Sequence, residues 1–437
     1  MRLATLSLWL FDCVAFSSVM LDVDQALAQF ALQPSMPPSA SALGAYRPIQ
    51  SGLPSAASKP CSCQPWADPY NDPIVYAPAR RGCVDGDTAA GYYPGCGPAP
   101  AACDLSQCCA PPPIIWGGRA GALFLFRDDS DHDLFSYDSA IETNQLLDAS
   151  EANEDFLPGV EARLVRFNLC TMRGIEGVYW GLYPSDGMAS VYSTDVTGNL
   201  DPILDYSQLT YDGDPASAYT NDALVHRLRT STEIHNVELN RLWGWPTSCR
   251  GWSPWTVTTL AGIRCFNFDE NLAFAADTMD TMFTGSPDEL YYTIDTDNNL
   301  YGGQLGAYFD RTFAGHWSAR SEVKAGVFAN DASAVSRIGG AAGTAVVNNG
   351  PNVGREWLVS ADKCDVAFLG ELRAGLTWQA TAHWRIVGDY RVMAVSGLAL
   401  PTEQIYHDLR GLQDVELLST DSFVVLHGAF VGAEWSY

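Results

Sequence analysis

The sequence has few basic residues and few charged residues overall. Its 437 residues include 25 Lys and Arg against 51 Asp and Glu, and charged residues make up 17% of the chain. Nucleic-acid binding depends on Lys and Arg that displace counterions, so a net charge of -26 argues against a nucleic-acid partner. After the first 28 residues no apolar run reaches the ~18 residues that a membrane-spanning helix needs. Residence in a membrane would therefore require a closed β-barrel.

Sequence motifs for common enzyme chemistry are also lacking. We find no G-x-x-x-x-G-K-[ST], no dinucleotide-binding fingerprint and no H-E-x-x-H. The 7 histidines are scattered, and none lies in a nucleophile-elbow sequence. A catalytic set on the rim of a barrel would involve His132 or His383, but His383 is more simply a lumen or interface residue. We therefore expect no enzyme activity and no cofactor.

The first 28 residues are typical of a secretory signal. Arg2 supplies the charged start, residues 3–21 form an apolar core that Asp12 interrupts, and Ala26-Leu27-Ala28 is a small-x-small cleavage site. The sequence thus predicts a cleaved signal peptide over 1–28 and an exported protein.

Residues 29–113 have no sustained periodicity and are rich in Pro, Ala, Ser, Gly and Cys. We expect an irregular periplasmic segment that disulfides hold together in part, because cysteines of exported chains are commonly oxidised. A metal site at Cys61, Cys63 and Cys83 is the alternative, although no His accompanies them.

The last residues, 421–437, read DSFVVLHGAFVGAEWSY and alternate in character. Every second residue counted back from Tyr437 is apolar or aromatic except His427, and the intervening residues are small or polar toward the end. A period of two predicts a strand with one apolar face. Tyr437 and Trp435 fit the terminal strand of an outer-membrane barrel with its aromatic girdle, although a strand of a soluble sandwich would alternate similarly.

Alternating segments predict ten strands over the second part of the chain. Their ranges are 116–127, 159–168, 175–183, 231–242, 255–268, 291–309, 317–328, 366–378, 383–395 and 422–437. The connections alternate between long (128–158, 184–230, 269–290, 329–365, 396–421) and short (169–174, 243–254, 310–316, 379–382). Outer-membrane barrels combine long extracellular loops, short periplasmic turns and an even strand count. A soluble sandwich has no reason to follow this rule.

The fold prediction is therefore all-β, with a transmembrane antiparallel up-and-down β-barrel over 114–437. The barrel has about ten strands, or twelve if 291–309 is a hairpin about Asp297-Asn298-Asn299. The irregular Cys/Pro-rich segment precedes it.

Five stretches of the barrel region carry a family resemblance. They are WGGRAGALFLF (116–126), VELNRLW (237–243), LAGIRCFNFDENL (260–272), NNLYGGQLGAYFD (298–310) and HWSARSEVKAGVF (316–328). They resemble the porin-like outer-membrane β-barrel family of bacteria, the BBP type, over about 115–437. The sequence departs from this pattern at Cys265, where an aromatic residue is expected. The resemblance implies a bacterial outer-membrane barrel without catalytic residues and assigns no solute.

The second face of the late strands is charged. Its residues are Arg320, Glu322, Lys324, Glu371, Arg373, Arg385, Asp389, Arg391 and Glu434. A charge that faces lipid costs ~2–4 kcal/mol at the bilayer midplane, so we expect these side chains to face the lumen and to pair between strands. One interpretation is a constriction that screens solutes by size and charge. The other is a salt-bridged plug, because a barrel of about ten strands is close to the size that side chains fill.

Acidic clusters mark the predicted extracellular loops. Asp129, Asp131 and Asp133 are weak candidates for calcium ligands, but no complete calcium loop is present, and solvated loops are the default interpretation. The leading functional hypothesis is porin-like, passive passage of small hydrophilic solutes, with outer-membrane lipid and the barrel assembly machinery as partners. The alternative is a non-conducting structural or adhesive surface protein with acidic loops. The oligomeric state stays open.

Overall fold

The computed structural model describes residues 114–128, 133–152, 156–169, 171–245, 255–313, 316–406, 408–410, 412 and 417–437. The predicted signal peptide, the Cys/Pro-rich segment with its disulfides, and the residues Asp129, Asp131 and His132 lie outside this part. Among the described residues, none of the helices combines the length and apolar character needed to cross a membrane.

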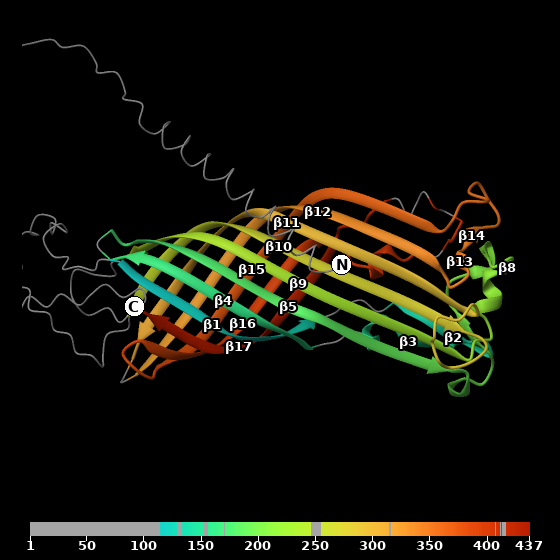
Figure 1. Cartoon of the computed structure of the whole chain (residues 1–437), viewed down its shortest axis with the longest axis horizontal. Coiled ribbons are helices and arrows are strands. Elements are labelled where there is room, and N and C mark those ends of the chain that lie inside the picture. The colour runs from blue at the N-terminus through green and yellow to red at the C-terminus, as the bar shows by residue number, and fades with distance from the viewer. Residues whose placement is uncertain are drawn as a thin grey trace, which may run out of the picture. The chain divides into compact units, whose positions relative to one another are not determined.

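Ten long strands form one closed sheet (Figure 1). They are β1 (Ile114–Asp128), β4 (Phe156–Asn168), β5 (Arg173–Tyr192), β9 (Val225–Trp245), β10 (Trp255–Asp277), β11 (Glu289–Thr312), β12 (Trp317–Gly340), β15 (Leu358–Gln379), β16 (Trp384–Leu398) and β17 (Ser422–Ser436). Each pairs antiparallel with the next in chain order, and β17 returns to pair with β1. The predicted ten-stranded up-and-down barrel is confirmed.

The twelve-strand alternative is wrong, because β11 runs without a break through Asp297-Asn298-Asn299. Residues of this stretch pair with Phe268, Asn267 and Asp269 of β10 on one side and with β12 on the other. Asn298 faces inward and is buried, whereas Asp297 and Asn299 face outward. These polar residues therefore belong to a strand with a polar outer face and do not form a turn.

The alternation of each strand separates an outer from an inner face. On β12, Val323 and Val327 are 42% and 55% exposed, whereas Glu322 and Lys324 are each 2% exposed. We call the outward-facing residues of 116–126, 156–164, 175–183, 237–245, 255–265, 301–309, 317–329, 366–378, 384–396 and 423–437 the apolar band. Trp317 lies opposite Trp378 at the short-turn edge of the apolar band, as expected for an aromatic girdle.

The strands differ strongly in length. β9, β10, β11, β12 and β15 have 21, 23, 24, 24 and 22 residues, whereas β1, β4, β16 and β17 have 15, 13, 15 and 15. A tilted strand crosses a bilayer in about 9–11 residues, so the long strands continue past the apolar band. The outward row of β10 changes there from Cys265 to Asn267, Asp269 and Asn271. The predicted long connections are correspondingly shorter than expected.

Beyond the apolar band, the strand extensions and the long connections form a folded unit that we call the head (133–152, 186–232, 269–296, 332–365 and the described part of 399–421). It contains β2 (Leu134–Asp138), β3 (Ile141–Asp148), β6 (Leu200–Pro202), β7 (Leu209–Tyr211), β8 (Asp214–Pro215), β13 (Gly343–Thr344), β14 (Val346–Val347) and the 3-10 turns Ala149–Ala152, Ser193–Asp195, Tyr206–Gln208, Ala216–Tyr219 and Thr402–Gln404. These small elements lie at the right-hand end of the barrel in Figure 1.

The head has its own hydrophobic core. Phe274 and Tyr292 enter it from the long strands, and Phe135, Tyr206 and Trp357 enter it from the connections. All five side chains are at most 2% exposed, and the rings of Phe135 and Phe274 stack at 5.6 Å. Because burial of one large apolar side chain contributes about 1.5–3 kcal/mol, this core explains why long connections are ordered.

Two carboxylates hold turns of the head. Asp138 accepts hydrogen bonds from the amides of Thr197, Ala140 and Gly198, each at 2.9 Å. These bonds, with the Thr197 amide contributing most, lower the pKa of Asp138 to about 2. Glu289 accepts from the amides of Gly285 and Ser286 at 2.9 and 3.0 Å. Burial alone would raise the pKa of Glu289, but the bonds from Tyr291 and these amides lower it to about 2.

Acidification should release these turns. A carboxylate with a depressed folded pKa contributes stability that is present above the ordinary value near 4 and lost as the pH falls through about 2. We expect the amides of Thr197, Gly198 and Gly285 to lose protection from hydrogen exchange between about pH 4 and 2, after correction for intrinsic rates. Asp138→Asn and Glu289→Gln should produce the same loss at neutral pH. Asp214→Asn, at an exposed position, serves as the control, and protection that survives in the first two variants would contradict this account.

Candidate functional site in the barrel interior

The inner wall of the membrane-spanning part carries as many basic as acidic side chains. We call this set the charged layer: Arg119, Arg163, Arg264, Arg320, Lys324, Arg373, Arg385 and Arg391, with Glu161, Glu176, Glu238, Asp310, Glu322, Glu371, Asp389 and Glu434. All nine predicted lumen residues belong to it and face inward. Of the nine, only Arg320 has a side chain more than 6% exposed, at 18%. The structure thus brings the predicted set together and adds to it.

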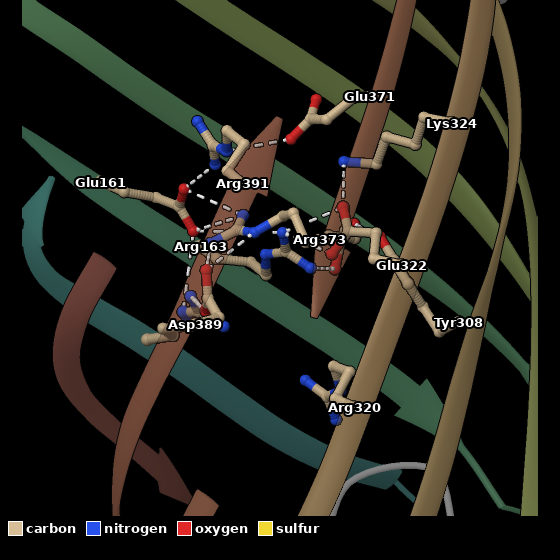
Figure 2. Close-up of polar contacts among 12 residues, drawn as sticks. Glu161, Arg163, Tyr308, Arg320, Glu322, Lys324, Glu371, Arg373, Asp389 and Arg391 are labelled. Atoms are coloured by element: carbon tan, nitrogen blue, oxygen red, sulfur yellow. Dashed lines mark hydrogen bonds and ion pairs between the residues drawn. The ribbon is translucent and has the colours of Figure 1, made fainter. Parts of the chain in front are cut away.

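Glu161 of β4 is the central acceptor of the charged layer (Figure 2). Its side chain is fully buried and accepts two hydrogen bonds from Arg373, both at 3.0 Å. Arg391 also donates to Glu161, and Nε of Arg119 lies 3.6 Å from it. Arg373 and Arg391 are direct neighbours in the β15–β16 register. The shared carboxylate offsets the repulsion that two adjacent like charges would cause.

Several pairs of the charged layer join strands that are not neighbours. Arg163 of β4 donates to Glu322 of β12 at 3.2 Å. On one side β5, β9, β10 and β11 separate these two strands, and on the other β1, β17, β16 and β15 do. The pair therefore spans the lumen from one wall to the opposite wall, as the central part of Figure 2 shows. Pairing between adjacent strands, which the sequence predicted, is observed for Arg385 and Glu434 at 3.0 Å.

Further contacts complete the network on the other walls. Lys324 lies 2.9 Å from Glu238 and 2.6 Å from Glu322. Arg264 donates to Glu371 at 2.9 Å. Two more groups close the set: the Tyr308 hydroxyl donates to Glu176 at 2.5 Å, and Asp389 accepts from Arg373 and Arg119.

Aromatic rings flank the guanidinium groups. Arg119 lies 4.0 Å from the ring centroid of Phe430, and Arg373 lies 5.8 Å from the same ring. Arg391 lies 5.0 Å from the ring of Trp180. Cation–π attraction is larger in a desolvated setting than at a surface, so these rings help to hold the arginines away from water.

The charged layer is enclosed by apolar side chains above and below. We call the buried group above it the apolar layer; its larger members are Leu123, Leu125, Trp180, Ile234, Phe266, Phe268, Leu300, Phe328, Leu369, Met393 and Leu426. Val165, Phe167, Leu242 and Leu260 lie beside Tyr308 at the short-turn end. The inner face of the barrel is therefore apolar over much of its length.

A connection also folds into the barrel. Leu398, Ala399 and Leu400 are at most 2% exposed. The Asn298 side chain donates to the Ala399 carbonyl at 2.8 Å and accepts from its amide at 2.7 Å. The chain turns inward at Gly397, whose φ of +84° and close approach to the Val366 carbonyl favour glycine.

Sequence reasoning missed the charged residues on the early strands and the whole apolar layer. Glu161, Arg163, Glu176, Glu238 and Arg264 were not singled out, although VEARLVR (160–166) alternates as regularly as the later strands. That alternation is the signal that could have identified Glu161 and Arg163. At Leu123 and Leu125 the apolar layer left no such signal, because both faces of that segment are apolar.

The described histidines make contacts in different parts of the fold. His383 bonds the Ser436 carbonyl at a turn, His427 contacts the Tyr390 hydroxyl on the outer face, and buried His226 bonds Ser136 and the Thr220 carbonyl. Within the part of the chain that the structure describes, no group of three or more His, Cys, Asp or Glu could hold a metal ion. Asp133, the one described calcium candidate, belongs to no such group.

Removing the central acceptor should destabilise the barrel. Glu161→Gln keeps the shape of the side chain but leaves Arg373 and Arg391 without their shared charge, at a cost of about 3–5 kcal/mol. The measurement is urea unfolding of the vesicle-reconstituted protein, followed by tryptophan fluorescence. Asp186→Asn removes the same charge from an exposed pair with Arg229, whose side chains are 51% and 53% exposed, and should cost under about 1 kcal/mol. Equal losses in the two variants would argue against a stabilising charged layer.

Comparison with known proteins finds a family model that matches part of the chain. The family model described as "Putative beta barrel porin-7 (BBP7)" matches residues 226–426. A search of curated proteins finds no match. Among solved structures, the outer membrane protease OmpT from Escherichia coli is 9% identical, with 75% of this chain and 97% of that chain covered and a TM-score of 0.36.

Two further solved barrels show likeness of the same order. A major outer membrane protein from Thermus thermophilus is 11% identical, with 74% and 99% covered and a TM-score of 0.28. A FadL homologue from Pseudomonas aeruginosa is 8% identical, with 74% and 90% covered and a TM-score of 0.24. No activity is inferred from likeness at this level. The family match confirms the resemblance drawn from the sequence: residues 226–426 carry the pattern of the porin-like BBP family of outer-membrane β-barrels.

Proposed function

We propose that the chain is a closed outer-membrane barrel that anchors the head on the cell surface and conducts no solutes in this conformation. The observation that carries the proposal is the pair between Arg163 and Glu322, which joins opposite walls at 3.2 Å. A solute on the barrel axis would have to separate these two groups. The proposal includes no catalytic step, and its partners are outer-membrane lipid and the barrel assembly machinery.

Opening the charged layer would carry a large energetic cost. Each of its central groups is desolvated by the wall and by its neighbours, with Glu161, Arg391 and Lys324 at most 1% exposed at their side chains. Breaking a buried pair so that one charge is left without a partner costs about 3–5 kcal/mol. Each of these residues takes part in several ion pairs, so more than one pair would have to break before ions could pass.

Two further features support closure. The apolar layer would have to be hydrated along the path of any ion, and apolar constrictions act as barriers by excluding water. The inward connection at 398–400 lies above the charged layer, and the Asn298 side chain bonds both the amide and the carbonyl of Ala399 there. A barrel of about ten strands also lies near the size that side chains fill.

The head gives the closed barrel a surface role. Its extended strands and connections have a buried core, while its rim carries exposed acidic residues such as Glu142, Asp195 and Asp212. A structural or adhesive role at the cell surface fits such a unit better than a role in passage, because the head's core adds another layer above the apolar layer.

Porin-like passage of small hydrophilic solutes remains the second candidate function. It is favoured by the charges of both signs on the inner wall and by the match to a porin-like family. It would require a conformation in which Arg163 and Glu322 have separated and the 398–400 connection has left the lumen.

Single-channel recording distinguishes the two functions. The full chain, refolded into a planar bilayer, should show no steady current at either polarity, and insertion is checked by heat-modifiable migration of the folded barrel. Steady conductance of the unaltered protein would overturn the proposal. If its ion selectivity also shifted in the Arg373→Ala and Arg385→Ala variant, the path would run along the charged layer.

A surface role makes a separate prediction for the head. Replacing residues 204–219, which contribute Tyr206 and Leu209 to the core, by a short flexible linker should lower attachment of expressing cells to surfaces while leaving barrel insertion unchanged. Shortening the 379–382 turn at the opposite end is the control. Attachment that is equal in both variants and in the unaltered cells would contradict an adhesive head.

A further inference from the structure

Four outward-facing arginines lie at the short-turn end of the barrel, on one half of its circumference. They are Arg166 on β4, Arg173 on β5, Arg241 on β9 and Arg311 on β11. All four are exposed. We call them the arginine belt. A concentration of positive charge on the outer wall contrasts with the net charge of -26 of the whole chain.

The register places the belt residues and aromatic residues side by side around the wall. Trp116 of β1 is the cross-strand partner of Arg166, and Trp243 of β9 is the partner of Arg173. Ile175 of β5 joins the first group to the second, because it pairs with both Arg166 and Arg241. On the next strands, Trp255 of β10 pairs with Arg311. These pairs place the belt and its tryptophans on neighbouring strands from β1 to β11.

Three of the four guanidinium groups lie over tryptophan rings. The distances to the ring centroid are 5.9 Å for Arg166 over Trp116, 5.8 Å for Arg241 over Trp243 and 5.1 Å for Arg311 over Trp255. Amphipathic aromatic rings of membrane proteins lie at the level of the lipid headgroups. The rings therefore place these guanidinium groups at that level, with their stems along the apolar band.

The arginine belt lacks an acidic counterpart among the residues that the structure describes. Within the described residues, no carboxylate lies at ion-pair distance from any of its four arginines. The outward residues that surround them are apolar or neutral, such as Leu164, Leu239, Ala261 and Phe309. Arg229, an outward arginine of the head, differs in this respect, because it pairs with Asp186 at 2.9 Å.

The other half of the barrel lacks such charges at the same height. There Trp317 lies opposite Trp378, and Trp384 lies opposite Trp435. The described outward residues next to these pairs, including Ala319, Leu376 and Ile386, are apolar. An aromatic girdle therefore encircles the barrel, but only one half of it carries arginines.

We propose that the arginine belt binds the phosphodiester headgroups of anionic phospholipids in the periplasmic leaflet of the outer membrane. The inference rests on the membrane placement in the proposed function, in which the short turns are periplasmic. A guanidinium presents a planar fork of donors that matches phosphate oxygens, and it retains its charge at the membrane surface. The belt would thus collect anionic lipid on one half of the barrel and leave the other half in contact with neutral lipid.

The test is the lipid that the barrel retains. The full chain is reconstituted into vesicles of phosphatidylcholine and phosphatidylglycerol with identical acyl chains, released gently, and its bound lipids are counted by native mass spectrometry. Since an arginine at a membrane surface changes affinity for anionic lipid by about five-fold, we expect several-fold enrichment of phosphatidylglycerol over its vesicle fraction. The enrichment should fall as salt is raised, because salt screens exposed charges.

Variants identify the belt as the cause. The combined change Arg166→Gln, Arg173→Gln, Arg241→Gln and Arg311→Gln should abolish the enrichment, whereas the four corresponding Arg→Lys changes should retain most of it. Arg229→Gln removes an exposed arginine of the head and should leave it unchanged. Should the four-fold variant insert poorly, the pair Arg241→Gln and Arg311→Gln gives the same comparison with a partial loss.

The outcomes separate the belt from the proposed function. If the unaltered protein inserts but shows no headgroup preference, only the proposal of lipid binding by the arginine belt is overturned. An equal preference in the Gln variants would have the same consequence. Failure of the full chain to insert into either lipid would overturn the membrane placement and the belt together. Conductance, measured separately, bears on closure and leaves the belt untouched.

Discussion

The charged side chains buried inside the barrel each need a partner of opposite charge, and the arrangement of the strands supplies these partners. A carboxylate or guanidinium removed from water is costly unless it is paired and hydrogen-bonded. Here the inner wall supplies equal numbers of both signs, and residues such as Glu161 serve several arginines at once. The alternation of the strands places every such group inside, and the apolar band outside is consequently free of carboxylates. The proposed closure of the lumen rests on this pairing, because the partners lie on different walls.

The uneven strand lengths connect this interior to the surface. Strands β9 to β12 and β15 continue past the bilayer, and their inner faces change from charged to apolar as they do so. This extended wall gives the long connections an apolar surface to cover, so the head folds against it. The membrane part and the head thus share strands but have different cores: the first holds the charged layer between apolar groups, and the second is hydrophobic. This arrangement supports the proposal that the barrel anchors the head.

Much of the fold could be predicted from the sequence, and less of the site. Period-two alternation over 317–328, 366–378 and 422–437 placed the late strands and assigned their faces, because charge and apolar character separate cleanly there. It also placed β1, but it could not assign the faces of that strand at Leu123, Phe124, Leu125 and Phe126, which are apolar on both sides. Alternation in the sequence assigns the two faces of a strand only when they differ in polarity. It gives no assignment where both faces are apolar. The links between opposite walls, such as Arg163 to Glu322, depend on barrel closure, which no local pattern contains.

The pairs of the charged layer also constrain the order in which the barrel can be completed. Glu161 bonds Arg373 and Arg391, which follow it by 212 and 230 residues, and Arg119 bonds Asp389 after 270 residues. Contacts of such separation form late, because the intervening chain must first be brought into place. Before β15 and β16 are in place, Glu161 of β4 lacks Arg373 and Arg391 as partners. Its carboxylate is then more stable in contact with water. We therefore expect a nascent barrel to keep a hydrated interior until the final strands close the sheet and exclude water.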